Sequence, residues 1–153
     1  MSTDQRTLVL LKPDAVQRGL VGTLVARLEA RGLKIVAMKL MRLDRDTAAR
    51  HYEAHLGKPF FRGLVDFITS APLVAMVVQG PGAVDMVRAI MGATDPLKAA
   101  PGTVRGDLAT DIGRNLIHGS DSLEASDREI PLFFGDGEII DYPRELDPWI
   151  TGP

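Results

Sequence analysis

The sequence predicts an α+β fold whose core is a four-stranded, mainly antiparallel sheet covered by helices. Strand-like and helix-like runs follow in the order strand, helix, strand, two helices, strand, helix, long loop, short helix, strand. Neither Gly-x-Gly-x-x-Gly nor Gly-x-x-x-x-Gly-Lys-Ser/Thr occurs, which disfavours a doubly wound nucleotide-binding fold. The 153 residues suit one hydrophobic core, so we predict a single domain over residues 1–153. The order of elements is that of the ferredoxin-like βαββαβ class, with helices inserted before the third strand.

The first third of the chain is predicted to form a strand, a helix and a second strand. Residues 7–11 are almost wholly apolar and stop at Lys12-Pro13, as expected for a strand covered on both faces. Residues 33–43 are rich in Ile, Val, Leu and Met and form the second predicted strand. Between the two strands, a helix ending at Gly32 is predicted by apolar residues at helical spacing: Leu20, Val21, Leu24, Val25 and Leu28.

The middle of the chain is predicted to add three helices and a third strand. Residues 45–55 have a polar helical pattern, and Pro59 suits the first turn of another helix. Residues 73–78 are typical of a buried strand, and residues 83–91 follow as a helix.

Two histidines four residues apart, His51 and His55, raise the question of a metal site. No third ligand lies nearby in the sequence, and the His-Glu-x-x-His pattern is absent. We therefore predict no set of protein ligands for a metal.

The last third is predicted to hold a long loop, a short helix, a final strand and an arm. Residues 92–115 show no convincing periodicity, and so long an irregular segment usually carries function or contacts a subunit. Asp121 or Ser122 can cap a helix. Residues 130–134 are interpreted as the final strand, and residues 135–153 as an extended C-terminal arm.

Composition excludes several classes of protein. A net charge of −2 gives no general attraction to nucleic acid or to an acidic membrane surface. No apolar run approaches the length of a membrane span, and the first six residues lack the apolar core of a signal peptide. The absence of cysteine rules out disulfides and fits a reducing cytosol, so a cytoplasmic location is expected.

His118 is the most promising reactive side chain. It stands beside Gly119, two serines and an acid, just before the predicted helix cap, where backbone N–H groups favour anions. Exposure and a suitable orientation are what a nucleophile needs, and Gly119 would let the backbone turn so that the ring stands out. The alternative is an ordinary loop histidine bonded to a neighbouring carbonyl.

Several separated motifs decide between these interpretations, because together they resemble the nucleoside diphosphate kinase family over nearly the whole chain. The motifs are Val-Leu-Leu-Lys-Pro-Asp-Ala-Val from Val9, His51-Tyr52, Lys-Pro-Phe-Phe from Lys58, Met-Gly-Ala-Thr-Asp-Pro from Met91, Pro-Gly-Thr-Val-Arg-Gly-Asp from Pro101 and His-Gly-Ser-Asp from His118. The resemblance implies transfer of the γ-phosphate of a nucleoside triphosphate, typically ATP, to a nucleoside diphosphate. It also implies a ping-pong route through a phosphohistidine at His118. The implied activity maintains the pools of nucleoside triphosphates.

The resemblance also assigns roles to individual residues. Glu129 would orient the ring of His118, Ser120 would assist, and Tyr52 would support Lys12. The implied nucleotide contacts are phosphate binding by Arg88, Arg105, Thr94 and His55, sugar and terminal-phosphate binding by Lys12 and Asn115, and base binding by Phe60, Leu64 and Ile112. Mg²⁺ is expected on the nucleotide, bridging phosphate oxygens more than protein carboxylates. A homo-oligomer is implied, with a hexamer favoured and a tetramer possible.

Two other functions are compatible with the same fold. A non-catalytic nucleotide sensor would need the arginines and Phe60 but no oriented imidazole. A nucleic-acid-binding protein as the main role is disfavoured by the net charge and the few aromatics. His118 is therefore the residue that separates an enzyme from a sensor.

Overall fold

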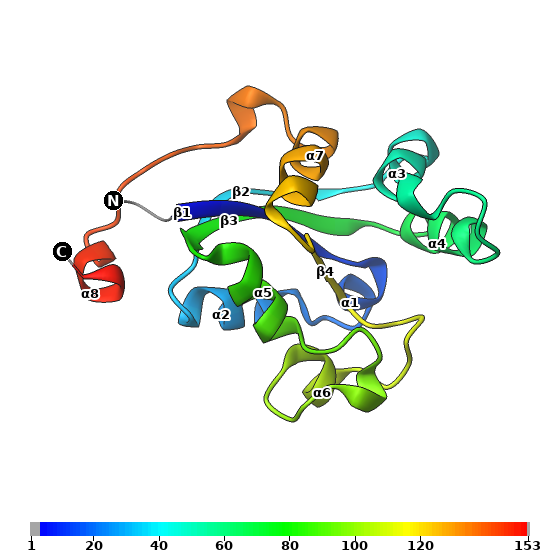
Figure 1. Ribbon diagram of the computed structural model, residues 1–153, viewed down its shortest axis with the longest axis horizontal. Helices are drawn as coiled ribbons and strands as arrows, with labels where there is room; N and C mark the ends of the chain where they lie inside the picture. The colour runs from blue at the N-terminus through cyan, green and yellow to red at the C-terminus, as the bar shows by residue number, and fades with distance from the viewer. Residues whose placement is uncertain (1–3, 153) are drawn as a thin grey trace.

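The computed structural model describes residues 4–152; residues 1–3 and Pro153, at the two ends of the predicted domain, lie outside the described residues. Its centre is a four-stranded antiparallel sheet with the order β2-β3-β1-β4 (Figure 1). The strands are β1 (Asp4–Leu11), β2 (Lys34–Met41), β3 (Leu73–Pro81) and β4 (Ile117–Gly119). The predicted α+β fold with four antiparallel strands is confirmed.

Helices cover both faces of the sheet (Figure 1). One face carries α3 (Arg45–His51), α4 (Phe61–Ile68) and α7 (Leu123–Phe133). The other face carries α1 (Pro13–Gln17), α2 (Val21–Ala30), α5 (Ala83–Met91) and, at its border, α6 (Val104–Leu108). The helices predicted over residues 20–32, 45–55 and 83–91 are present, although the second ends at His51 and continues as a 3₁₀ turn, Glu53–His55.

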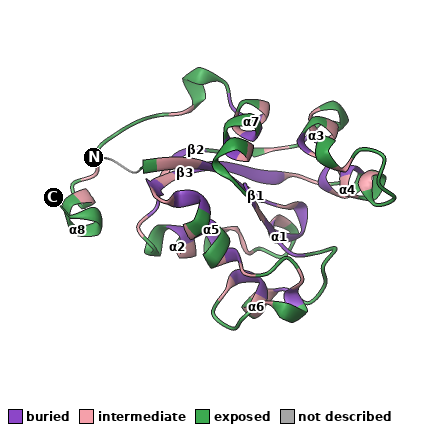
Figure 2. Ribbon diagram, in the orientation of Figure 1, coloured by how far each residue is buried: buried purple, intermediate pink, exposed green. Residues whose placement is uncertain are grey.

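The alternation of side chains along β1 divides the core into two halves. Leu8 and Leu10 point to the face covered by α3, α4 and α7, whereas Val9 and Leu11 point to the face covered by α2 and α5. All four are fully buried, and Figure 2 shows the central strands buried along most of their length. This explains why residues 7–11 form a continuous apolar run instead of an alternating one.

The predicted final strand was wrong. Residues 130–134 are the end of α7 and its C-cap, and the true fourth strand is β4, which pairs with β1 in the register Leu10 to His118. Ser122 begins α7, because its hydroxyl accepts a hydrogen bond from the backbone N–H of Ala125 at 3.0 Å. The helix then buries Ser126, Glu129 and Phe133 on one face, at spacings of three and four residues.

The segment between α5 and β4 is more ordered than predicted. It contains a 3₁₀ turn, Pro96–Lys98, and α6, whose N-cap Thr103 accepts a hydrogen bond from the backbone of Gly106 at 3.0 Å. The short helix α1 was also missed, because Lys12-Pro13 was interpreted only as the end of a strand although proline suits a first helical turn.

The segment after α7 runs along the sheet edge to the opposite end of the molecule (Figure 1). It is not extended throughout, because it contains a 3₁₀ turn, Asp136–Glu138, and α8 (Asp147–Thr151). Ile140 donates its backbone N–H to Val36 at 2.8 Å, and the Tyr142 hydroxyl donates to the carbonyl of Ile35 at 2.6 Å. These bonds attach the arm to β2.

Within residues 4–152, no helix combines the length and the apolar character needed to cross a membrane.

Candidate active site

His118 lies in the middle of β4, between the central strand β1 and helix α5. A Cβ atom at Gly119 would lie 2.6 Å from the sulfur of Met91 and 2.9 Å from a methyl group of Val87. Glycine is therefore required here because α5 packs closely against the strand, and not, as predicted, because the backbone turns. Close packing on both sides fixes the position of the backbone that carries His118.

The chain enters β4 through a strained residue. Leu116 has a φ of 75°, in the left-handed region that few non-glycine residues adopt. Its backbone N–H donates to the carboxylate of Asp14 at 3.0 Å, and its carbonyl accepts from the backbone N–H of Lys12 at 2.9 Å. The segment that holds Lys12 and the segment that leads to His118 are thus joined directly.

His118 is oriented by an ionised carboxylate. Its Nε2 lies 3.0 Å from Oε1 of Glu129, and the same oxygen accepts a hydrogen bond from the Ser120 hydroxyl at 2.7 Å. Burial would raise the pKa of Glu129, but the hydrogen bonds from His118 and Ser120 and the charge of His118 lower it to about 2. Because an ionised carboxylate only accepts hydrogen bonds, Nε2 must donate. In neutral His118 the lone pair is then on Nδ1, the ring nitrogen nearer the backbone.

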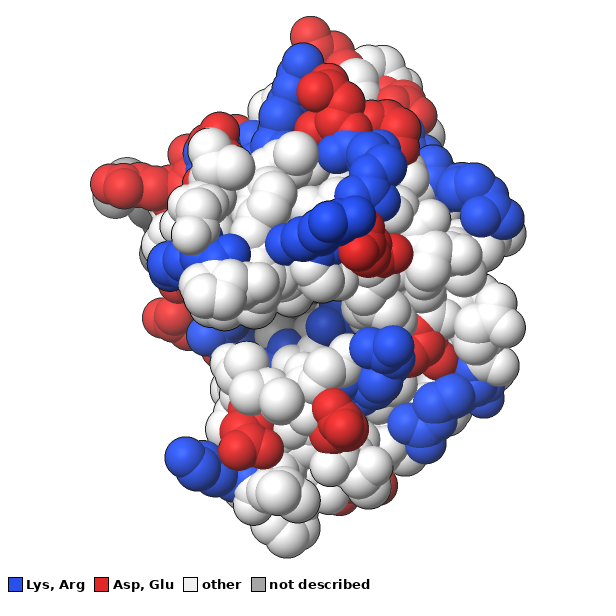
Figure 3. All heavy atoms as spheres, turned by 90° about the vertical axis from the view of Figure 1, so that its right-hand side faces the viewer, with Lys and Arg blue, Asp and Glu red and all other residues white. Residues whose placement is uncertain are grey.

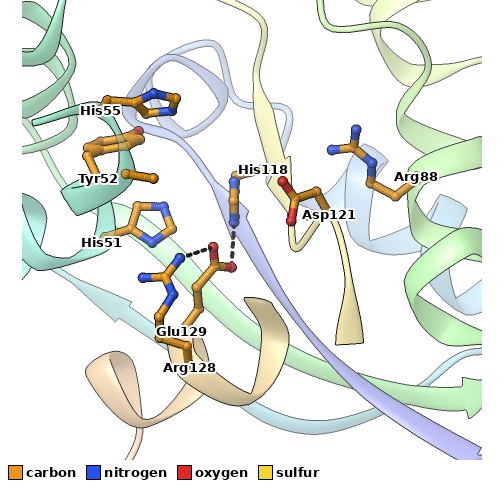
Figure 4. Close-up of a pocket in the computed structure, with 10 residues that line it drawn as sticks. His51, Tyr52, His55, Arg88, His118, Asp121, Arg128 and Glu129 are labelled. Atoms are coloured by element: carbon orange, nitrogen blue, oxygen red, sulfur yellow. Dashed lines mark hydrogen bonds and ion pairs between the residues drawn. The ribbon is translucent and has the colours of Figure 1, made fainter. Parts of the chain in front are cut away.

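A pocket of about 240 Å³ lies in front of this pair (Figure 4). Five of the predicted site residues line it: Tyr52, His55, Arg88, His118 and Glu129. Five further residues line the pocket and were not predicted from the sequence to do so: His51, Ala54, Gly119, Asp121 and Arg128. The pocket therefore combines the candidate nucleophile with cationic and aromatic side chains.

A second group of predicted residues forms a hydrogen-bonded network beside β4. Lys12 donates through Nζ to the side-chain oxygen of Asn115, and the amide nitrogen of Asn115 donates to the carbonyl of Thr94 at 3.0 Å. Arg105 is buried and donates to three backbone carbonyls, those of Gly92, Asn115 and Ile117, at 3.1, 3.1 and 2.6 Å. Arg105 therefore holds the loop against the strand, a structural role that its sequence position did not reveal.

These cations are close enough to affect one another. Burial lowers the pKa of Lys12 to about 8; nearby Asp14 opposes this shift, whereas Arg105 and Arg114 add to it. Burial, with the charge of Arg88, lowers the pKa of Arg105 to about 10. Figure 3 shows the corresponding surface, a hollow between the α3–α4 region above and the α6 region below, with basic side chains in its floor and along its border. Such a concentration of positive charge suits a polyphosphate.

The three residues predicted to bind a base come from two separate segments, α4 with its N-cap and the loop before β4. The ring of Phe60 is 51% exposed at the start of α4, and its centroid lies 5.2 Å from that of His55. Leu64 is half-buried one turn further along α4, whereas Ile112 is exposed in the turn between Asp111 and Arg114. The exposed ring of Phe60 offers a face on which a flat ligand can stack.

Tyr52 and His51 line the pocket with largely buried rings. Burial, with the charge of Glu129, raises the pKa of Tyr52 to about 12, so its hydroxyl stays protonated. Burial, reinforced by the charge of His118, lowers the pKa of His51 to about 3, so its ring stays neutral. The centroids of the His51 and His118 rings are 4.7 Å apart, with the planes at 82°. From the sequence, His51 was considered only as a metal ligand together with His55, and it was not assigned to this site.

Comparisons with known proteins agree with this geometry. The family described as "Nucleoside diphosphate kinase" matches residues 5–139. A nucleoside diphosphate kinase of Desulforamulus reducens is 57% identical over 146 residues, which cover 95% of this chain and 98% of the relative.

Two solved structures are similar over nearly their whole length. A halophilic nucleoside diphosphate kinase from Halobacterium salinarum in complex with CDP has a TM-score of 0.94 at 55% identity, covering 96% of this chain and 98% of that one. A transition state mimic of nucleoside-diphosphate kinase from Borrelia burgdorferi, with bound vanadate and ADP, has a TM-score of 0.94 at 36% identity and 99% coverage of both chains.

Proposed function

The chain belongs to the nucleoside diphosphate kinase family, whose phosphotransferase activity it has, and we propose that His118 carries the phosphate between two nucleotides. The observation that carries this proposal is the 3.0 Å contact between Nε2 of His118 and the ionised Glu129. It leaves the lone pair of neutral His118 on Nδ1 and places a negative charge behind the ring. A nucleotide sensor would not need an imidazole oriented in this way.

The first half-reaction follows from this orientation. Nδ1 attacks the γ-phosphorus of the triphosphate, a nitrogen–phosphorus bond forms, and the bond to the oxygen that bridges the β- and γ-phosphates breaks. The nucleoside diphosphate leaves with the electron pair of that bond. The ring of the phosphohistidine keeps its proton on Nε2, and the carboxylate of Glu129 stabilises the positive charge that develops on the ring. Ser120 fixes the carboxylate by its 2.7 Å hydrogen bond.

The second half-reaction is the reverse, with a different nucleoside diphosphate. A terminal phosphate oxygen of the acceptor attacks the phosphorus, and the nitrogen–phosphorus bond breaks, which regenerates neutral His118. We assign phosphate binding to Lys12, Arg88, Thr94, Arg105, Asn115 and His55, with Tyr52 supporting Lys12. We assign base stacking to Phe60, Leu64 and Ile112.

Mg²⁺ fits this site as a partner of the nucleotide more than of the protein. Basic side chains dominate around the network of Lys12 and Arg105, and Glu129 is already bonded to His118 and Ser120. Asp121 lines the pocket with an exposed carboxylate and is the residue best placed to face the ion, directly or through water. When bound, Mg²⁺ would neutralise part of the phosphate charge.

The direct test is to isolate the intermediate. The protein incubated with γ-labelled ATP and Mg²⁺, without an acceptor, should retain about one label per chain. The label should be lost in acid and survive alkali, as a phosphorus–nitrogen bond to an imidazole requires, and any nucleoside diphosphate should discharge it. A label that resists acid would place the phosphate on a hydroxyl such as that of Ser120.

Nucleotide affinity should depend on the protonation of Lys12. Its pKa of about 8 means that the ammonium group is charged below this pH and loses its charge as the pH rises through it. Because phosphate favours the charged form, affinity for ADP should fall by up to about tenfold per pH unit above pH 8. Calorimetric titrations between about pH 7.5 and 9.5 measure this slope.

Lys12→Arg is the matched control for the pH effect, since arginine keeps its charge over the whole range. The variant should lose the slope even if its affinity differs from that of the parent. The same slope in both proteins would assign the titration to another group.

Phe60→Ala should weaken the binding of all nucleotides to a similar extent. Stacking on an aromatic ring uses a face that every base has, and its loss costs about 1–3 kcal/mol, or about 5- to 150-fold in affinity. Dissociation constants for ADP, GDP and CDP, measured together, check this. If purines and pyrimidines were affected very differently, hydrogen bonds to base edges would have to replace stacking as the explanation.

We also propose a homo-oligomer in the cytoplasm, with a hexamer favoured over a tetramer. Large apolar side chains are exposed in the loop after α5 and in the C-terminal arm, among them Leu97, Leu146 and Trp149 at 83%, 65% and 86%. A contiguous exposed apolar patch marks a contact with another chain, and we propose that these side chains contribute to such a patch. Sedimentation equilibrium of the full chain distinguishes six subunits from four.

A further inference from the structure

His51 is a buried polar side chain behind the candidate nucleophile. It is 4% exposed, and neither ring nitrogen has a hydrogen-bond partner among residues 4–152. Its ring contacts Tyr52, Phe133 and His118. Leaving a buried polar group unpaired costs about 1–3 kcal/mol, so a ring that served only to fill space would be more stable as an apolar one.

The nitrogens of His51 lie close to two other ligand groups. His51, His118 and Glu129 each offer one nitrogen or oxygen atom, and these three atoms lie within 4.8 Å of one another. The groups come from three separate elements, α3, β4 and α7, and converge on the back of the pocket (Figure 4). The sequence had suggested the pair His51 and His55, but His55 is not part of this group.

The distances are near those of a metal centre. Zinc lies about 2.0–2.2 Å from nitrogen and oxygen ligands, so ligand atoms in a tetrahedral site are about 3.3 Å apart. The 3.0 Å separation of Nε2 of His118 and Oε1 of Glu129 already matches this value. The three ligand atoms lie within 4.8 Å of one another, so a nitrogen of His51 must move by up to about 1.5 Å to reach this spacing.

We infer that His51, His118 and Glu129 form an inhibitory zinc site that shares two residues with the phosphotransfer site. Two imidazoles and one carboxylate, with a fourth position left for water, are a ligand set that Zn²⁺ prefers. Mg²⁺ prefers oxygen ligands throughout and is excluded by the two nitrogens. Arg128, 3.6 Å from the other oxygen of Glu129, is an adverse charge, but its side chain is 40% exposed and can turn outward.

Zinc would block phosphotransfer because it changes the tautomer of the His118 ring. In neutral His118 the proton is on Nε2 and the lone pair on Nδ1. Zn²⁺ takes the place of the proton on Nε2, and a ring that stays neutral then carries that proton on Nδ1, transferred through solvent. Nδ1 no longer has a lone pair for the γ-phosphorus. This inhibition rests on the proposed role of His118, whereas the binding of zinc does not.

Zinc binding can be tested on the unaltered protein, because the chain has three histidines. Titration with ZnCl₂, followed by NMR of the imidazole resonances, should shift those of His51 and His118 and leave those of His55 in place. Co²⁺ as a probe should give the intense visible absorption of a tetrahedral site. Shifts confined to His55, or to His118 without His51, would overturn the proposed ligand set.

His51→Phe separates ligation from packing, since the new ring keeps the contacts with Tyr52 and Phe133. Zinc affinity should fall by at least about 10- to 100-fold. A loss of this size already follows when only a residue that supports a metal ligand is replaced. His51→Asn provides a second variant if circular dichroism shows that the first does not fold. His55→Gln is the matched control at the end of the same helical segment and should bind zinc like the parent. Equal affinity in the parent and both folded His51 variants would overturn the proposal.

Inhibition is measured by phosphate labelling at buffered zinc concentrations, relative to the zinc-free rate of each protein. The parent should be inhibited and should recover with a zinc-selective chelator, and His51→Phe should require at least about tenfold more zinc. Zinc that binds to His51 and His118 without slowing labelling would overturn the inhibitory role. If the zinc-free parent were not labelled at all, the proposed function would fail, and the NMR result on zinc would stand separately.

Discussion

His118→Ala is expected to abolish labelling by γ-labelled ATP and to leave the affinity for ADP largely unchanged. The variant lacks the nitrogen that forms the covalent bond, and removal of a nucleophile that acts with its partners lowers turnover by at least about 10⁴-fold. The network of Lys12, Asn115 and Arg105, to which we assign phosphate binding, is held by hydrogen bonds in which the His118 side chain takes no part. Labelling and calorimetric binding on the same sample measure the two effects.

Two graded variants serve as controls for His118→Ala. Ser120→Ala removes the 2.7 Å hydrogen bond to Glu129, and Glu129→Gln removes the charge behind the ring while keeping an oxygen that can accept from Nε2. Both should slow labelling without eliminating it. A His118→Ala protein that still transferred phosphate at a near-normal rate would point to direct transfer between two bound nucleotides.

Arg105→Ala should reduce both turnover and stability. The proposed role of Arg105 in phosphate binding implies a loss of about 10²- to 10³-fold in turnover, because charge on the phosphate is redistributed in the transition state. The same change leaves the carbonyls of Gly92, Asn115 and Ile117 without their donor, at a cost of about 1–3 kcal/mol in the free energy of unfolding. Steady-state kinetics and urea unfolding measure the two losses.

Arg88→Ala is the control that distinguishes a loss of turnover from a loss of stability. Arg88 is exposed on α5 and lines the pocket. Its replacement should lower turnover by a similar factor and change the unfolding free energy by less than about 0.5 kcal/mol. Equal stability of the two variants would show that the backbone bonds of Arg105 contribute little. An increase in KM with unchanged kcat in either variant would limit that arginine to binding in the ground state.

The sequence predicts the first three strands well because each is a long apolar run whose ends are marked by proline, glycine or charge. It fails at the fourth strand for a physical reason. β4 has three residues, one of them a histidine and one a glycine, and it is a strand only because β1 lies beside it. Residues 130–134 are a short, mostly apolar run and were therefore interpreted as a strand, whereas the cap at Ser122 and the burial of one face keep residues 130–133 helical.

The structure brings several of the predicted site residues together, although their roles stay predictions. Lys12, Thr94, Asn115 and Arg105 are joined by hydrogen bonds, and His118 meets Glu129 as expected. Neither the structural role of Arg105 nor the position of His51 could be inferred from the sequence. The first depends on the path of a loop without periodicity, and the second on how α3 packs against α7 and β4.

The position of β4 also determines when the active site can form during folding. Lys12 and Asn115 bond to each other although they are 103 residues apart, and β4 pairs with a strand that begins at the fourth residue of the chain. Contacts between such distant segments form late, because a long loop must close first. A chain emerging from the ribosome therefore exposes an unpaired edge of β1 until β4 has been made. We expect the nascent protein to be most prone to aggregation at that stage, and to acquire its oriented histidine only when Glu129 follows.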